Sequence, residues 1–111
     1  MSNFGITEKS YALLMELFTR QPEVEEVWLF GSRAKGTHQK GSDIDLAIKG
    51  SACNPGLALA IANQANEELP IPYQVDIVDY SSIDNPDLKD HIDRVGVLFY
   101  RSKTEANVPS I

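Results

Sequence analysis

The chain has 111 residues, a formal charge of −6 and one cysteine, Cys53. This length predicts a single domain, and the apolar and charged fractions of 42% and 23% argue against disorder along the whole chain. One cysteine excludes an internal disulfide and a cysteine-based zinc site. The acidic balance argues against general nucleic-acid binding, and no apolar run reaches the roughly 20 residues that span a bilayer. With no signal-peptide pattern, we expect a cytoplasmic protein without membrane association.

The first half of the chain predicts a helix, a strand, a polar loop and a second strand. The helix covers 7–20, with Thr7 as its N-cap and apolar residues at helical spacing. A strand over 24–30 alternates its apolar side chains and ends at a glycine. The loop 31–42 carries three glycines, and the second strand covers 43–48.

The second half predicts two further helices, each opening on an Asn-Pro pair whose Asn is the N-cap. We expect a helix over 55–69, a strand over 73–78, a helix over 86–95 that ends at Gly96, and a short strand over 97–100. This alternation predicts an α/β fold with one central sheet. Residues 1–101 are expected to form the single domain and residues 102–111 a polar tail.

Asp43 and Asp45 are the first candidate site residues. They lie two apart in a predicted strand, so both side chains project from the same face. Two like charges this close repel each other, by about 4 kcal/mol at ~4 Å in an effective dielectric near 20. A cation between them removes that repulsion, and carboxylate oxygens suit Mg²⁺, which binds through one or two carboxylates and substrate phosphates.

The loop before these carboxylates predicts a phosphate site. Gly31 allows a ligand to approach the backbone closely, and Ser32 adds a hydroxyl donor. A helix that begins near Ser32 would favour a phosphate at its N-terminus. Arg33 is one of three basic side chains that concentrate positive charge in this loop. A phosphate cradle beside a carboxylate pair is the equipment of metal-assisted nucleotidyl transfer.

A third carboxylate is expected on the strand over 73–78, where it would help to activate an acceptor hydroxyl. Asp76 lies inside the strand between apolar residues, where a carboxylate is costly without a function. Asp79 lies at the strand end, where a turn-forming Asp is ordinary. We therefore favour Asp76.

The joint pattern Gly31-Ser32, ten further residues and Asp43-Ile44-Asp45 resembles the signature of the DNA polymerase β-like nucleotidyltransferase superfamily. The short length and the strand around Asp76 are similar to its minimal nucleotidyltransferase branch, called MNT. The resemblance covers roughly residues 7–101. It implies a polymerase β-like fold with a small mixed sheet of three to four strands flanked by helices.

The resemblance also implies roles for residues. Asp43, Asp45 and Asp76 would be catalytic and would bind Mg²⁺ as two ions, while Gly31, Ser32, Arg33 and Ser42 would hold the nucleotide. The reaction would move a nucleoside monophosphate, AMP from ATP, onto a hydroxyl. Members of this size are often antitoxins that transfer AMP to a tyrosine of a helical HEPN-type toxin, so the resemblance implies a nucleoside triphosphate and such a protein as partners.

Two other functions fit the same residues. The domain could neutralise a helical partner by contact alone, with a silent site, or it could modify a small molecule. A homodimer through an exposed sheet edge is a further alternative. His91 lies among acidic residues of the last helix, and its helix predicts a solvated acidic face rather than a metal site.

Overall fold

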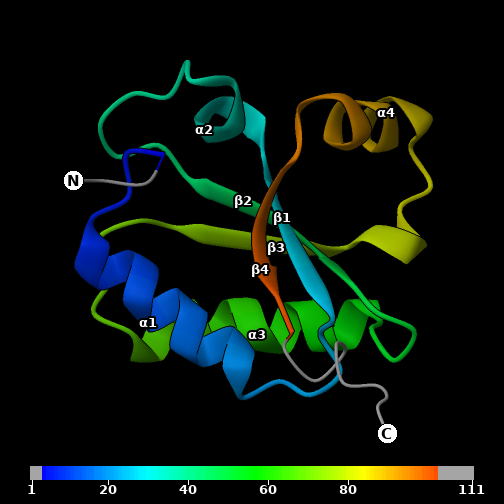
Figure 1. The fold of residues 1–111 in the computed structure, drawn as a ribbon, viewed down its shortest axis with the longest axis horizontal. Coiled ribbons are helices and arrows are strands. Elements are labelled where there is room, and N and C mark those ends of the chain that lie inside the picture. The colour runs from blue at the N-terminus through cyan, green and yellow to red at the C-terminus, as the bar shows by residue number, and fades with distance from the viewer. Residues whose placement is uncertain (1–3, 103–111) are drawn as a thin grey trace, which may run out of the picture.

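The computed structural model describes residues 4–102. Its strands form one sheet in the order β3-β2-β1-β4, with β2 parallel to β3 and the other pairs antiparallel (Figure 1). This confirms the predicted α/β fold with a small mixed sheet. The elements are α1 (Glu8–Thr19), β1 (Glu26–Phe30), α2 (Gly31–Lys35), β2 (Ile44–Lys49), α3 (Pro55–Glu68), β3 (Val75–Asp79), the 3₁₀ turn η1 (Tyr80–Ser82), α4 (Pro86–Val95) and β4 (Val97–Arg101).

Three helices begin where the capping residues predict. The Thr7 hydroxyl accepts a hydrogen bond from the Ser10 amide at 3.2 Å, and the Asn54 side chain accepts one from the Leu57 amide at 2.8 Å. Asn85 caps α4 in the same way. Each side chain satisfies a backbone N–H that has no acceptor inside its own helix, so these starts are local properties of the sequence.

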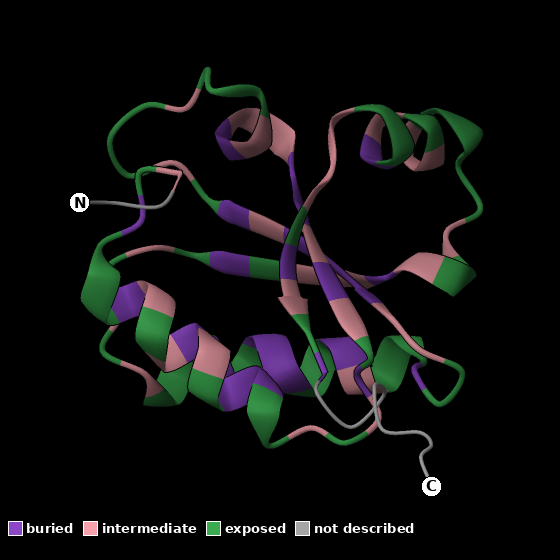
Figure 2. Cartoon of the chain, in the orientation of Figure 1, coloured by how far each residue is buried: buried purple, intermediate pink, exposed green. Residues whose placement is uncertain are grey.

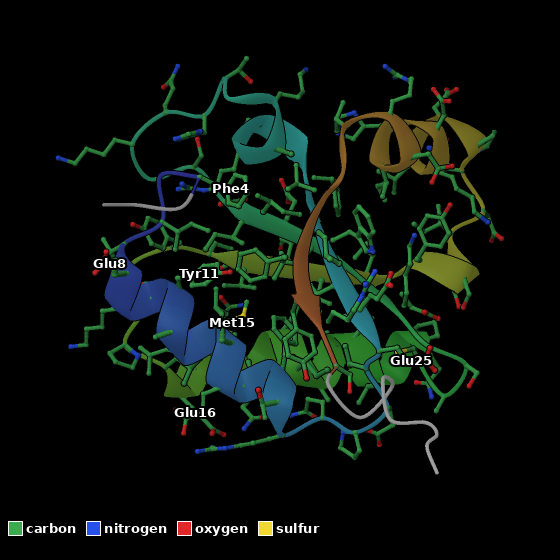
Figure 3. The ribbon with its side chains drawn as sticks, in the orientation of Figure 1. Phe4, Glu8, Tyr11, Met15, Glu16 and Glu25 are labelled. Carbon is green, nitrogen blue, oxygen red and sulfur yellow. The ribbon has the colours of Figure 1, made fainter. Side chains whose placement is uncertain are left out.

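The main core lies between the sheet and the helices α1 and α3. Buried residues gather on the inner sides of both helices and along β1 and β2 (Figure 2). From α1, Tyr11 and Met15 point toward the sheet, whereas Glu8 and Glu16 lie on its outer side (Figure 3). The sheet contributes alternate residues that are fully buried: Val27, Leu29, Ile44, Leu46, Ile48 and Val75.

The opposite face of the sheet is covered by α2 and α4 (Figure 1). A smaller core of Phe30, Ala47 and Ile92 lies under α4. The predicted alternation is confirmed, because Phe30 lies on this face and Leu29 on the other. Asp45 is two residues from Ala47 in β2 and therefore projects from the α2 and α4 face.

The structure differs from the expected elements in several places. Residues 31–35 of the expected loop form the helix α2, β1 begins at Glu26, and β2 begins at Ile44, after Asp43. β3 begins at Val75 rather than at Tyr73, whose ring instead lies under the Arg33 guanidinium at 4.7 Å. The 3₁₀ turn η1 was not predicted. The expected polar tail lies, beyond residue 102, outside the described residues. No helix among those described is long and apolar enough to cross a membrane.

Candidate active site

Two of the three predicted carboxylates, Asp45 and Asp76, lie on neighbouring strands at the α2 and α4 face of the sheet, and Asp43 lies next to one of these strands in the chain. Asp43 directly precedes β2 and Asp45 is its second residue. The parallel register places Asp45 opposite Asp76 of β3, and the antiparallel register places it opposite Phe30 of β1. Residues directly opposite in register share a face, so the pairing brings Asp45 and Asp76 together from distant parts of the chain.

The electrostatics of Asp45 show how close these charges are. Burial raises the pKa of the Asp45 carboxyl above its ordinary value of 3.8, and the charges of Asp76 and Asp43 raise it further. His91 and Arg33 act in the opposite direction. Asp45 is half-buried, whereas Asp43 and Asp76 are exposed. The three carboxylates therefore repel one another at a site that solvent and a ligand can reach.

The exposure of Asp76 and Asp79 differs from the expectation from sequence. We expect Asp76 to be shielded inside its strand and Asp79 to be a solvated or turn-forming residue at the strand end; instead Asp76 is exposed, and Asp79 has only 4% of its surface exposed. The reason is that β3 is an edge strand, whose α2 and α4 face is open at Asp76. Asp79 lies on the other face and accepts hydrogen bonds from the hydroxyls of Ser81 and Ser82. Its role in a turn is confirmed.

The Gly31 backbone lies directly against the Asp45 carboxylate. Gly31 follows β1 without a gap, begins α2 and has a φ of +75°, which favours glycine. A Cβ built at this position would overlap Asp45 Oδ2. The turn from β1 to α2 therefore brings the Gly31 backbone beside the Asp45 carboxylate, and Ser32 follows half-buried at the next position.

Arg33 is buried, with 2% of its surface exposed, and its guanidinium binds backbone oxygens. Nη2 donates to Ser42 O at 2.7 Å, Nη1 to Phe4 O at 2.9 Å, and Nε to Asp43 O at 3.3 Å. The expectation that Arg33 contacts the nucleotide is not supported by this geometry. Arg33 instead ties the segment before β2 to α2, and we treat it as a positioning residue.

Ser42, like Arg33, forms hydrogen bonds that hold the segment before β2. Its hydroxyl accepts a hydrogen bond from the Gln39 amide at 2.8 Å, and its carbonyl oxygen is the main acceptor for Arg33. These contacts hold the backbone that presents Asp43. A nucleotide contact of the Ser42 side chain stays a prediction.

We expect Arg33→Lys to destabilise the protein by about 2–4 kcal/mol. Lysine keeps the charge but cannot reproduce the fork of donors, so buried carbonyl oxygens lose their partners. Urea unfolding of the variant measures the loss, with the exposed Lys35→Arg exchange in the same helix as a control. A variant as stable as the parent would show that these hydrogen bonds contribute nothing.

His91 is the site residue that sequence reasoning missed. Its Nε2 accepts a hydrogen bond from the Gly31 amide at 3.2 Å, and its ring packs edge-on against Phe30 with centroids 6.1 Å apart. The imidazole therefore faces the carboxylate site, although its helix also carries the predicted acidic surface. No local signal could have shown this, because α4 meets α2 only through the tertiary fold.

The oxygen donors of the site are of the kind that Mg²⁺ prefers. Among the described residues, no three acidic, His or Cys side chains are drawn together as a closed metal cage. Mg²⁺ commonly uses one or two protein carboxylates and completes its shell with water and substrate phosphates. The open pair of Asp45 and Asp76, with Asp43 close enough to raise the Asp45 pKa, fits that pattern.

Comparison with known proteins gives three findings. The family model described as polymerase beta, nucleotidyltransferase matches residues 13–105. The probable protein adenylyltransferase MntA of Haemophilus influenzae (strain ATCC 51907 / DSM 11121 / KW20 / Rd) is 33% identical over 84 residues, which are 76% of this chain and 73% of that protein.

Solved structures supply the third finding. A toxin–antitoxin complex with AMP-PNP contains a chain with a TM-score of 0.66 and 24% identity, over 90% of this chain and 77% of that one. A tri-AMPylated Shewanella oneidensis HEPN toxin in complex with MNT antitoxin gives a TM-score of 0.63 and 19% identity, over 88% and 75%. At these identities the likeness shows a shared fold.

Proposed function

Because the chain belongs to the polymerase β nucleotidyltransferase family, we propose that it transfers AMP from ATP onto a hydroxyl of a protein partner, as an antitoxin acting on a tyrosine of a HEPN-type toxin. Support comes from the similar probable protein adenylyltransferase and from the complexes of AMPylated HEPN toxin and of toxin–antitoxin with AMP-PNP. We also propose a cytoplasmic location, because the proposed reaction consumes ATP.

One observation of the structure carries this proposal. The Gly31 backbone lies against the Asp45 carboxylate, and Asp76 lies opposite Asp45 across the parallel strand pair. A triphosphate bound along Gly31 and Ser32 would therefore have its α-phosphorus beside these carboxylates. Phosphoryl and nucleotidyl transfer depend mainly on such positioning and on charge stabilisation.

Each residue has a distinct part in the proposed reaction. The N–H groups at Gly31 and Ser32 hold phosphate oxygens, and Asp76 accepts the proton of the acceptor hydroxyl. The hydroxyl oxygen then bonds to the α-phosphorus as the bond from that phosphorus to the bridging oxygen breaks, and pyrophosphate leaves. Asp43 and Asp45, with Asp76, would hold up to two Mg²⁺ ions. When bound, Mg²⁺ offsets the negative charge on the attacking and leaving oxygens.

The hydrogen bond between the Gly31 N–H and His91 must break before this N–H can bind a phosphate oxygen. In the structure His91 Nε2 takes the hydrogen bond that a phosphate oxygen would take. Displacement of the imidazole by the triphosphate is therefore part of the proposed binding step.

The function is tested by transfer of label from ATP. The purified protein is incubated with Mg²⁺ and lysate of its source organism, in parallel with ATP labelled at the α- or at the γ-phosphate. We expect one labelled protein band with the α-label alone, lost in an Asp43→Ala/Asp45→Ala control, and AMP on a tyrosine by mass spectrometry. A band from the γ-label would indicate phosphorylation, and no band from either label would favour neutralisation by contact.

Ligand-induced stabilisation gives an independent check. With Mg²⁺ and a non-hydrolysable ATP analogue at ~100 times the dissociation constant, the free energy of unfolding is expected to rise by about 2.7 kcal/mol. The rise should require both ligands, because each neutralises charge that the other leaves exposed. Thermal melts with each ligand alone and with both measure this effect. An unchanged melting temperature with both would contradict the proposed site.

A further inference from the structure

A groove runs along the outer edge of β3, directly beside the proposed active site. It encloses about 700 Å³ between α3 and the connection from η1 to α4. Its floor is β3 itself, including Asp76. Leu59 and Asn63 line it from α3, and Ile83 and Leu88 from the other side. A ligand in this groove would therefore meet the carboxylate that faces the acceptor hydroxyl.

The backbone of β3 offers hydrogen bonds to this groove. Gln74 O accepts from Ile44 N on the β2 side, so the peptide groups of the next residue, Val75, point away from β2. There the Asn66 side chain bonds both of them, with Val75 N–H and Val75 O each at 2.9 Å. Asn66 thus takes the place of a neighbouring strand at this position.

Two residues further on, at Ile77, no side chain of residues 4–102 takes this place. Alternation directs the N–H and C=O of Ile77 to the same outer edge, and within the described sheet β3 has a strand partner only in β2. Ile77 lines the groove. An open strand edge of this kind binds an extended peptide through its main chain.

The groove walls define the chemistry of the peptide. Its charged lining residues are all acidic: Asp76, Asp79 and Asp84. The Asp79 carboxylate accepts hydrogen bonds from serine hydroxyls, whereas the Asp76 and Asp84 carboxylates are exposed. Leu59 is an exposed apolar side chain on the α3 wall, with 62% of its surface accessible. Acidic groups with an apolar wall complement a basic segment that has apolar residues on alternate positions.

We propose that this groove is the acceptor site, in which an extended basic segment of the partner protein adds to β3 as a further strand and brings its hydroxyl to Asp76. The role as acceptor site rests on the proposed nucleotidyl transfer, whereas the strand addition does not. Apolar residues of the segment pack on Leu59, and its basic residues face Asp84, beside the hydroxyl at Asp76.

Peptide binding without nucleotide tests the groove. The probe is the synthetic peptide Lys-Val-Lys-Val-Tyr-Val-Lys-Val-Lys, with a second peptide in which every Lys is Glu. NMR of the ¹⁵N-labelled protein is expected to show a shifted Ile77 amide whose hydrogen exchange slows about tenfold or more with the Lys peptide. An unshifted Ile77 amide, or equal binding of the Glu peptide, would overturn the proposal.

A matched pair of variants locates the binding surface. The described chain has two large exposed apolar side chains, Leu59 in the groove and Leu98 on β4 at the opposite edge of the sheet. Leu59→Arg is expected to weaken binding of the Lys peptide about tenfold or more, whereas Leu98→Arg leaves the affinity unchanged. Equal effects of the two variants would contradict the site. Exchange protection at Ile77 in the free protein that disappears on dilution would show that a second copy occupies the edge.

The two proposals fail in different ways. Peptide binding at Ile77 without label transfer from ATP would contradict the proposed function but support peptide binding in the groove. The opposite result is label transfer that Leu59→Arg does not reduce, together with an unshifted Ile77 amide. It would contradict the proposed groove but support the proposed function.

Discussion

Asp45→Asn is expected to lower nucleotidyl transfer by about a thousandfold or more and, at the same time, to raise the melting temperature at neutral pH. The amide cannot hold a divalent cation as the carboxylate does, and a factor of ~10³ corresponds to about 4 kcal/mol of transition-state stabilisation. The gain in stability arises because Asp45 is charged at a half-buried place beside Asp76 and Asp43. Transfer assays and thermal melts of one preparation measure both effects.

The pH dependence of this gain follows from the sign of the pKa shift. The pKa of Asp45 is higher in the folded protein than its ordinary value of 3.8, so the folded state binds the proton more tightly than the unfolded state. Its contribution to stability is thus present below pH 3.8 and is lost as the pH rises through the raised folded pKa. The stability advantage of Asp45→Asn should appear across that window and persist at neutral pH.

Glu67→Gln serves as the control for charge. Glu67 is an exposed carboxylate on α3, and removing its charge changes the net charge by the same amount. Neither transfer nor the melting temperature should change appreciably. If Asp45→Asn lost activity but was also less stable than the parent at neutral pH, repulsion among the three carboxylates would not be the dominant interaction at this site.

Gly31→Ala is expected to reduce transfer about a hundredfold or more, whereas Gly36→Ala should leave it nearly unchanged. The two glycines have almost the same φ, +75° and +78°, so each alanine pays a similar backbone penalty of about 1–2 kcal/mol. At Gly31 the new methyl group also overlaps Asp45 Oδ2, whereas at Gly36 it meets nothing within 4 Å. Displacing a reacting group by ~1 Å can reduce the rate a hundredfold.

Comparison of these variants separates backbone strain from displacement of the carboxylate. Urea unfolding gives the stability of each variant, and the transfer assay gives its activity under conditions where both are folded. Equal losses of activity at Gly31 and Gly36 would mean that the positive φ alone matters. A loss confined to Gly31→Ala would show that the contact with Asp45 needs a residue without a side chain.

Much of the local structure could be predicted because it depends on residues close in sequence. Thr7, Asn54 and Asn85 mark helix starts because each satisfies amides within its own first turn. The alternation of a strand likewise put Phe30 and Leu29 on opposite faces of the sheet. Gly31-Ser32 followed by the pair of Asp43 and Asp45 was enough to identify the family from sequence.

Other features were decided by contacts between distant segments. In the sequence Arg33 is a loop cation expected to hold the nucleotide, yet its guanidinium binds carbonyl oxygens of two other segments. His91 reads as part of an acidic helix surface, yet the packing of α4 beside α2 brings it to the Gly31 amide. The contact partners of Arg33 and His91 do not lie at a fixed sequence spacing from them, so no local pattern predicts these contacts.

The sequence by itself determined the three capped helices, the approximate positions of the four strands and the family, because periodicity and capping act over a few residues. Only the tertiary structure decided that Asp76 lies opposite Asp45 and that β3 is the open edge beside the site. Strand order and register depend on how α3 carries the chain from β2 to β3 and on which apolar faces then pack. That choice is made by the whole core, so no local pattern contains it.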